Sequence, residues 1–349
     1  MQFNNYTPFT ALAWQHQNSN NQTFASTIAR VKYDLKTNLN NNTLDLKLSK
    51  DQGELFASDV YYADVGKSSL QYPSDYVNYK KYTDIIINAN AISPNNKASN
   101  TWTCGIEVYD EEQKLLIDYN LDIKSEVKYT KALLGRNKEK EAKTLSVPIR
   151  YEKAFGGIIQ KKSKNDEEEY IYTNGYNPIG CGKHKRKNIS KITYDEQILY
   201  KDDHKQKDRI PAGFGAIDKS WKSRLKYAGT YDDKWQKNQY PLPPKDYNDM
   251  FNQSSHPNLM LNTHLKDNTK IILKNLIPNI SFCTIYIPTL PIINKINTYT
   301  GNIYNKMNID TVLIDIDKED NYSLYISYRK QVELLEENSI SEVFMLDLI

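Results

Sequence analysis

The chain has 349 residues, with 46 Lys or Arg against 43 Asp or Glu and a formal net charge of +3. This length allows one large or two moderate domains, and the near balance of charge argues against nucleic acid or an anionic membrane as a partner. The three cysteines lie far apart and form no CxxC pair, which argues against a zinc knuckle or disulfide framework and favours a reducing compartment.

The ends of the chain and its apolar stretches predict a cytoplasmic protein. The N-terminal residues have neither the basic nor the apolar region of a signal peptide. The most apolar stretch, 271–293, is interrupted by Lys, Asn and Pro. Because a bilayer span needs roughly 20 mostly apolar residues, we expect no membrane segment.

Alternating apolar and polar residues predict strands along most of the chain. A run of Asn at 38–42 predicts a turn between the first two strands, because Asn tolerates left-handed φ. A short stretch at 331–337 has helical character. The strands are expected at 23–33, 43–48, 83–89, 102–110, 114–119, 270–276, 280–287, 311–317 and 322–328.

The spacing of these strands predicts the fold class. Short strands separated by turns are typical of antiparallel sheets in a sandwich or barrel-like arrangement. We therefore expect a mainly β protein with long ordered loops and few short helices. We expect the whole chain, 1–349, to form a single region, which could consist of two β subdomains, 1–145 and 146–349.

The stretch 211–251 differs from the rest, because it is rich in aromatics, Gly and Pro and has neither helix nor strand periodicity. Gly229 to Asp232 predicts a turn that leads to the aromatic anchor Trp235. Three prolines between 241 and 244 fix φ and remove donors, so this part is extended and lies outside any central strand. Such a stretch is either an ordered loop packed over a sheet or a flat recognition surface.

Several motifs resemble a bacterial family that carries a domain-of-unknown-function label and whose genes lie beside type VI secretion effectors. The clearest are VPIRYEKAFGG at 147–157, NPIGCG at 177–182, AGTYDDKW at 228–235 and PLPPKDYNDMFNQ at 241–253. Shorter matches are Ser74-Asp75, Lys80, Thr83-Asp84, Asp310-Thr311 and Tyr328-Arg329. The region 189–209 departs from the family pattern.

The resemblance implies an adaptor, or chaperone, that binds a cognate effector and loads it onto the VgrG or PAAR tip of the secretion spike. The effector could itself bear a PAAR domain. The mechanism would be protein–protein binding without catalysis or a cofactor. We hypothesise that the turn 151–157 and the loop 230–251 lie together and form the partner surface. The residues concerned are Tyr151, Glu152, Phe155, Gly156, Gly157, Tyr231, Asp232, Trp235, Pro241 and Phe251. The plainer interpretation is that these aromatics belong to the core.

Residue patterns give little support to an enzyme. The five His are scattered, and His256 and His264 have no common zinc spacing. Cys181 between two glycines is the one candidate nucleophile, with His184 near it in sequence. Of the two adjacent Asp pairs, 202–203 and 232–233, the second contains Asp232, which is more simply explained as a turn or cap ligand.

Two charged runs, 161–169 and 183–187, are best explained as a solvated loop tip and a loop cluster without a nucleic-acid role. The alternatives that stay open are a hydrolase-type enzyme and a carbohydrate-binding β-sandwich that uses its Tyr and Trp as sugar platforms.

Overall fold

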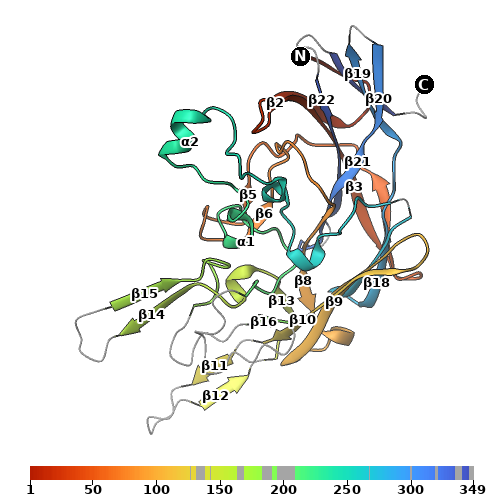
Figure 1. Cartoon of the computed structure of the whole chain (residues 1–349). Helices are drawn as coiled ribbons and strands as arrows, with labels where there is room; N and C mark the ends of the chain where they lie inside the picture. The colour runs from red at the N-terminus through yellow and green to blue at the C-terminus, as the bar shows by residue number, and fades with distance from the viewer. Residues whose placement is uncertain are drawn as a thin grey trace.

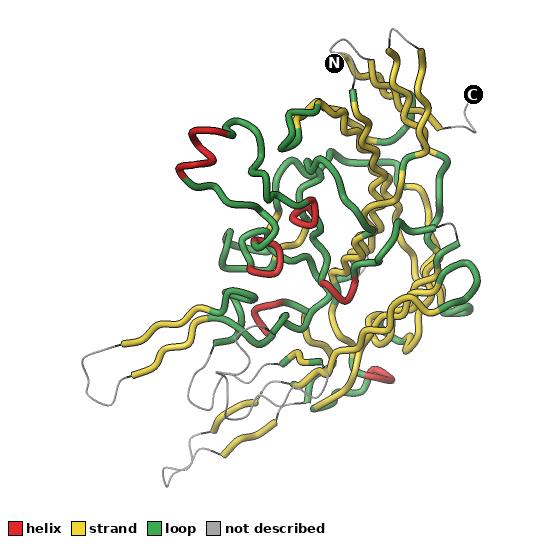
Figure 2. Tube along the Cα trace, viewed as in Figure 1, coloured by secondary structure: helices red, strands yellow, loops and turns green. Residues whose placement is uncertain are grey.

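The computed structural model describes most of the chain, and it is mainly β with long loops and few short helices (Figures 1 and 2). This confirms the predicted fold class. The described residues are 1–125, 127–130, 138–141, 143–162, 169–182, 191–194, 209–266, 268–298, 301–318, 321–334 and 340–345.

One large sheet forms the frame of the molecule, and strands from 1–145 and from 146–349 alternate within it. Most neighbours are antiparallel, but β18–β4 and β21–β7 are parallel. In order, its strands are β16 (Ile192–Thr193), β10 (Leu115–Lys124), β9 (Thr101–Tyr109), β17 (Lys270–Ile277), β18 (Ile280–Tyr286), β4 (Thr43–Leu48), β3 (Thr23–Asn38), β22 (Tyr322–Glu333), β21 (Asn308–Asp315) and β7 (Asp84–Asn88), with β2 (Thr10–Gln17) also paired to β3.

A second, four-stranded sheet lies at the end of the molecule where the N- and C-termini are found (Figure 1). Its order is β1 (Gln2–Asn5), β23 (Ile340–Met345), β19 (Ile292–Thr298) and β20 (Gly301–Lys306). Four two-stranded pairs complete the β structure: β5 (Val60–Tyr61) with β6 (Leu70–Tyr72), β8 (Asn90–Ile92) with β13 (Ser146–Pro148), β11 (Val127–Thr130) with β12 (Lys138–Glu141), and β14 (Ile158–Lys162) with β15 (Glu169–Thr173).

The helices in the described part of the chain are short and lie in the loops. They are α1 (Lys222–Leu225) and α2 (Asp233–Asn238), with 3-10 turns η1 (Pro94–Asn96), η2 (Tyr151–Lys153), η4 (Asp249–Asn252) and η5 (Pro257–Leu259). No helix in the described part of the chain is long and apolar enough to cross a membrane.

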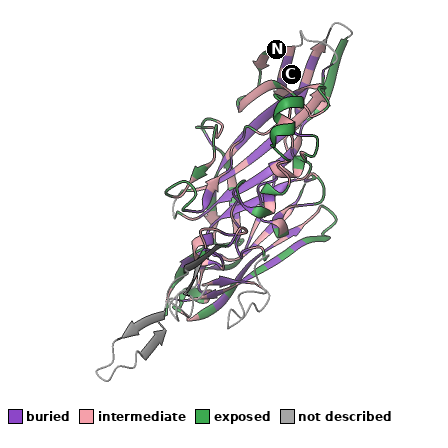
Figure 3. Cartoon of the chain, turned by 60° about the vertical axis from the view of Figure 1, so that its left-hand side comes forward, coloured by how far each residue is buried: buried purple, intermediate pink, exposed green. Residues whose placement is uncertain are grey.

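The core follows from the alternation of the strands (Figure 3). In β10, Ile117, Tyr119, Leu121 and Ile123 are buried on one face, whereas the residues between them are more exposed. Strand β7 is buried along its whole length, because it is covered on both faces. The apolar cluster that results extends along the large sheet.

The local predictions are mostly confirmed, with two exceptions. The strand expected at 43–48 is β4, and Asn42 in the preceding turn has a φ of 54°. The prediction of helical character at 331–337 is wrong for its described residues, because Gln331 to Glu333 continue β22 by pairing with β3. Pairing between strands overrides local helix propensity here. The second exception is 211–251, which contains α1 and α2 although no helix was expected there.

Candidate functional site

Tyr151 is a buried anchor and not an exposed contact. It lies in η2, and its ring meets the edge of Trp221 with centroids 5.1 Å apart. Its hydroxyl donates a hydrogen bond to the Gly215 carbonyl at 2.8 Å. A Cβ on Gly213 would lie 2.5 Å from the tyrosine ring. Glycine at 213 is therefore what lets the loop pack against Tyr151.

Glu152 ties the same turn to the hairpin formed by β5 and β6. Its carboxylate accepts from the Ser69 backbone N–H at 2.8 Å and from the Ser69 hydroxyl. That hydroxyl oxygen in turn accepts from the Tyr151 N–H at 2.9 Å. Both carboxylate oxygens of Glu152 therefore accept hydrogen bonds from within the protein.

Gly156 and Gly157 explain why two separate motifs fit together. Both have positive φ, +136° and +85°, where other residues are strained. Added Cβ atoms would lie 2.3 Å from the Asn177 carbonyl oxygen and 2.2 Å from the Gly180 carbonyl oxygen. Asn177 also donates from Nδ2 to the carbonyls of Tyr151 and Phe155, at 2.9 and 2.8 Å. We call residues 151–157 and 174–182 together the motif knot.

Residues 229–247, which we call the aromatic arm, form a loop that stands away from the sheets and carries α2 (Figure 1). The loop is closed at its base, where Thr230 donates to the Asp246 carboxylate from its N–H at 2.9 Å and from its hydroxyl at 2.7 Å. Gly229 provides a φ of +84° at this closure. The arm is therefore a defined loop rather than a loose strand of chain.

Internal hydrogen bonds hold the arm in shape. Asp232 caps α2 by accepting from the Trp235 N–H at 2.8 Å, which confirms its interpretation as a cap. The Trp235 indole N–H donates to the Leu242 carbonyl at 2.9 Å. The Gln239 amide donates to the Ser19 carbonyl at 2.8 Å, and so connects the arm to the turn between β2 and β3.

Three aromatic side chains of the arm form an exposed cluster, the aromatic trio of Tyr231, Trp235 and Tyr240. Tyr231 is 57% exposed and Tyr240 69% exposed, and Trp235 lies between them. The ring centroids of Trp235 are 4.7 Å from those of Tyr231 and 5.8 Å from those of Tyr240, both edge-on. Pro241, next in sequence, is also exposed. This is the accessible part of the hypothesised partner surface.

The knot and the trio are held by different neighbours. The link between the two regions runs through α1, where Arg224 donates to the Phe251 carbonyl from Nε and Nη2 at 3.0 and 2.8 Å. Trp221, directly before α1, packs on Tyr151. Phe251 is therefore linked to the knot through α1, whereas the arm that carries the trio contacts the β2–β3 turn, where Gln239 and Lys245 donate to the Ser19 carbonyl.

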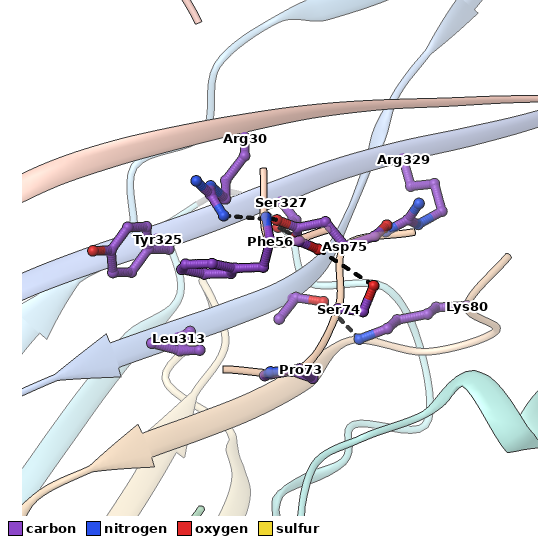
Figure 4. A pocket seen from close by; sticks show the side chains of 11 residues that line it. Arg30, Phe56, Pro73, Ser74, Asp75, Lys80, Leu313, Tyr325, Ser327 and Arg329 are labelled. Atoms are coloured by element: carbon purple, nitrogen blue, oxygen red, sulfur yellow. Dashed lines mark hydrogen bonds and ion pairs between the residues drawn. The ribbon is translucent and has the colours of Figure 1, made fainter. Parts of the chain in front are cut away.

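A second group of residues, to which the sequence patterns assigned no chemical role, forms a buried charge network (Figure 4). Arg30 contacts Asp75 at 2.7 Å, and the Arg329 Nε contacts Asp310 at 2.5 Å. Arg329 also donates to the Asp75 carbonyl at 3.0 Å. These contacts connect β3, β21 and β22 to the loop before β7.

The network continues through Lys80, whose Nζ contacts Asp84 at 2.7 Å and the Thr311 hydroxyl at 2.9 Å. Asp84 also accepts from the Ser254 N–H and the Ser255 hydroxyl. Burial acts to raise the pKa of Asp84, but Lys80 and these donors outweigh it, so the pKa lies below its usual value. The carboxylate is thus ionised and fully engaged.

This network has no room for a substrate. The cavity between Arg30, Asp75, Lys80 and Arg329 has a volume of about 10 Å³, which is the space of about one water molecule. The arrangement is that of a polar core, in which charges are buried only because each is paired. Asp75, Lys80, Asp84, Asp310, Thr311 and Arg329 lie in the short motif matches, and that resemblance is the signal that could have identified them. Arg30, Ser254 and Ser255 lie outside these matches.

The other residues considered as enzyme candidates are His256 and Cys181. His256 is buried and neutral, donating from Nε2 to the Pro211 carbonyl at 2.9 Å, and burial lowers its pKa to about 4. Cys181 is half-buried. Within the described residues, no group of three or more His, Cys, Asp and Glu could hold a metal ion. His184, the acidic pair 202–203, the cluster 183–187 and most of 161–169 lie outside the described residues.

Comparison with protein families assigns most of the chain to one family. Residues 20–329 match a family described as "Uncharacterized protein conserved in bacteria (DUF2169)". No curated protein and no solved structure matches the chain. The chain belongs to the DUF2169 family, whose description names no activity and no secretion role.

Proposed function

Starting from this family membership, we propose that the protein is a type VI secretion adaptor, or chaperone. It binds a cognate effector in the cytoplasm and helps to load it onto the VgrG/PAAR spike, by binding and without catalysis. Support comes from the motif resemblance at 147–157, 177–182, 228–235 and 241–253.

The observation that carries the proposal is the aromatic trio on its closed arm. Aromatic side chains dominate the binding energy of many interfaces. A cluster held in place before binding loses little conformational freedom on binding, which favours affinity. A stable complex buries about 800 Å² on each partner, more than three side chains supply. Neighbouring surface of the arm, including Pro241, would complete the contact.

The test is a pull-down with the tagged protein in lysate of the native bacterium, read by mass spectrometry. We expect the wild type to capture an effector together with a VgrG or PAAR protein. The double variant Tyr231→Ala/Tyr240→Ala should capture at least tenfold less, because it removes two exposed rings and leaves the Trp235 hydrogen bond in place. The matched control is Tyr304→Ala on β20, a tyrosine that is 60% exposed on the four-stranded sheet.

Two results would count against the proposal in different ways. If the double variant is folded and captures the same proteins as the wild type, the trio is not the interface. If the wild type enriches neither an effector nor a spike protein, the adaptor role itself is wrong.

A carbohydrate-binding role is the second candidate, and one observation favours it. Phe282 and Tyr286 lie four residues apart on β18, so both side chains are on one face, and both are exposed. Aromatic rings on a flat sheet face can stack on sugars. A glycan array with the wild type and with Phe282→Ala distinguishes the two candidates, because the adaptor role predicts no glycan signal for either.

A further inference from the structure

Two aspartates lie together at the end of β21. Asp315 is the last residue of this strand, and its carboxyl interacts with both the backbone N–H and the carboxyl of Asp317. Asp315 is buried, and the Asp317 side chain is only 5% exposed. Two neighbouring carboxyl groups that are both buried disfavour simultaneous ionisation.

The groups around the pair come from separate parts of the fold. The Tyr72 hydroxyl, on β6, donates to the Asp315 carboxylate. Arg150, directly before the motif knot, donates from Nη2 to the Asp317 carboxylate at 2.6 Å, and its guanidinium lies 3.5 Å from the centroid of the Tyr62 ring. The pair therefore fastens the β5–β6 hairpin and the start of the knot to the end of β21.

The next shell holds further titratable groups. On β22, Tyr325 meets Tyr72 edge-on at 6.0 Å. From β3, Arg30 and Lys32 reach the face of the Tyr325 ring at 5.3 and 5.9 Å, and Asp34 acts on the same tyrosine. In the described structure these cations contact the Tyr325 ring, while Arg150 is the cation that contacts the pair itself.

Charge and hydrogen bonding around the pair are incomplete when both carboxylates are ionised. One guanidinium then faces two buried negative charges. The Tyr62 hydroxyl interacts with the Asp317 side chain. Neither this hydroxyl nor the Asp317 Oδ1, both buried, has a partner at regular hydrogen-bond geometry among the described residues, and such atoms are rare in native structures. One added proton removes the excess charge and supplies a donor between the two carboxyls.

We propose that Asp315 and Asp317 are a proton-binding pair that takes up one proton in the folded protein. At mildly acidic pH this proton stabilises the folded end of β21, because it relieves the repulsion between two buried carboxylates. This inference does not depend on the adaptor role.

The direction of the pH dependence follows from linkage. Burial raises the pKa of Asp315 from 3.8 to about 6; the Tyr72 hydrogen bond opposes this shift and Asp317 adds to it. Between about 4 and 6 the folded state holds a proton that the unfolded state has lost, so this contribution to stability decreases as pH rises through that window. His256, with its pKa lowered to about 4, has the opposite effect, because its contribution is lost as pH falls from 6.5 towards 4.

Because these effects oppose each other, the experiment compares variants at each pH. Urea unfolding is measured at pH 4.5 and 7.5 for the wild type and for Asp315→Asn, which keeps an acceptor for Tyr72 but cannot ionise. The unfolding equilibrium constant of the wild type relative to the variant should rise roughly 20-fold between the two pH values. The matched control, Asp64→Asn, changes an aspartate whose side chain is 80% exposed and should give a ratio that changes less than twofold.

A ratio for Asp315→Asn that is the same at both pH values overturns the proposal, because an effect of the substitution that involves no proton would be equal at each. If that variant does not fold, the carboxyl ¹³C resonances of the wild type decide. We expect one aspartate to titrate near 6, and Tyr72→Phe to raise that midpoint by removing a donor to the ionised form. If all aspartates titrate below about 4.5, the pair binds no proton in this range and the proposal is wrong.

Discussion

The motif knot and the aromatic arm both contain motifs that resemble the family's, yet they differ in burial. In the knot, Tyr151, Gly156 and Gly157 are enclosed, and each is required by a specific close contact. In the arm, Tyr231 and Tyr240 face solvent although the backbone beneath them is fixed. A motif can therefore record how a chain packs as readily as what it binds, and burial separates the two cases.

The largest expected effect is on the knot. Gly157→Ala places a Cβ 2.2 Å from the Gly180 carbonyl oxygen at a φ of +85°. We expect the free energy of unfolding to fall by roughly 3 kcal/mol or more, from clash and backbone strain together. Thermal and urea unfolding measure it.

Gly66→Ala is the matched control for this substitution. Gly66 has a similar φ of +71°, but no atom lies within 4 Å of the added Cβ. It should cost only the strain, about 1 kcal/mol. If both variants lose the same stability, contact with Gly180 is not what makes glycine necessary at 157.

A middle-sized effect is expected at Tyr151. Tyr151→Phe keeps the packing on Trp221 but leaves the Gly215 carbonyl without its donor. The expected loss is about 1–2 kcal/mol in urea unfolding. A variant as stable as the wild type would show that the ring alone holds this loop.

A smaller loss is expected in the arm when the cap of α2 is removed. Asp232→Ala deletes the acceptor for the Trp235 N–H, and the expected loss is about 0.5–1 kcal/mol, the low end for a cap on an exposed helix. Hydrogen exchange should quicken in α2 and not at residues 151–157. Faster exchange in both regions would mean that the knot and the arm unfold together as one unit.

The smallest effect on stability is expected for the trio itself. Tyr240→Ala removes a largely exposed ring, so unfolding should change by less than about 0.5 kcal/mol. Partner capture in the pull-down should nevertheless decrease. A loss of stability comparable to that of Tyr151→Phe would place Tyr240 in the structural group instead.

Local patterns predicted what depends on local physics. The strand β4 and the turn with left-handed Asn42 before it could be predicted, because strand faces and turns are set by neighbouring residues. Asp232 was recognised as a cap, but six residues without periodicity gave no sign of α2 itself. The charge network was not readable from chemistry, because Arg30, Asp75 and Arg329 meet only after distant strands have paired.

The site hypothesis shows the same division. Sequence located the arm and the knot, yet it could not tell exposed from enclosed aromatics. Tyr151 and Tyr231 both stand in motif blocks, and only the neighbours supplied by other loops, such as Gly213 and Trp221, decide which one is covered.

The pairing of β3 with β22 has a consequence for how the protein is made. The register runs from Leu35 opposite Tyr322 to Phe24 opposite Glu333. Strand β3 can therefore pair only after β22, almost 300 residues later in the sequence, has been synthesised. During synthesis β3 emerges long before its partner, with the apolar surface of Ile28 and Val31 uncovered. Pairing over such sequence separation is slow and leaves the nascent chain open to aggregation. Folding of the large sheet therefore cannot be completed before residues 322–333 have left the ribosome.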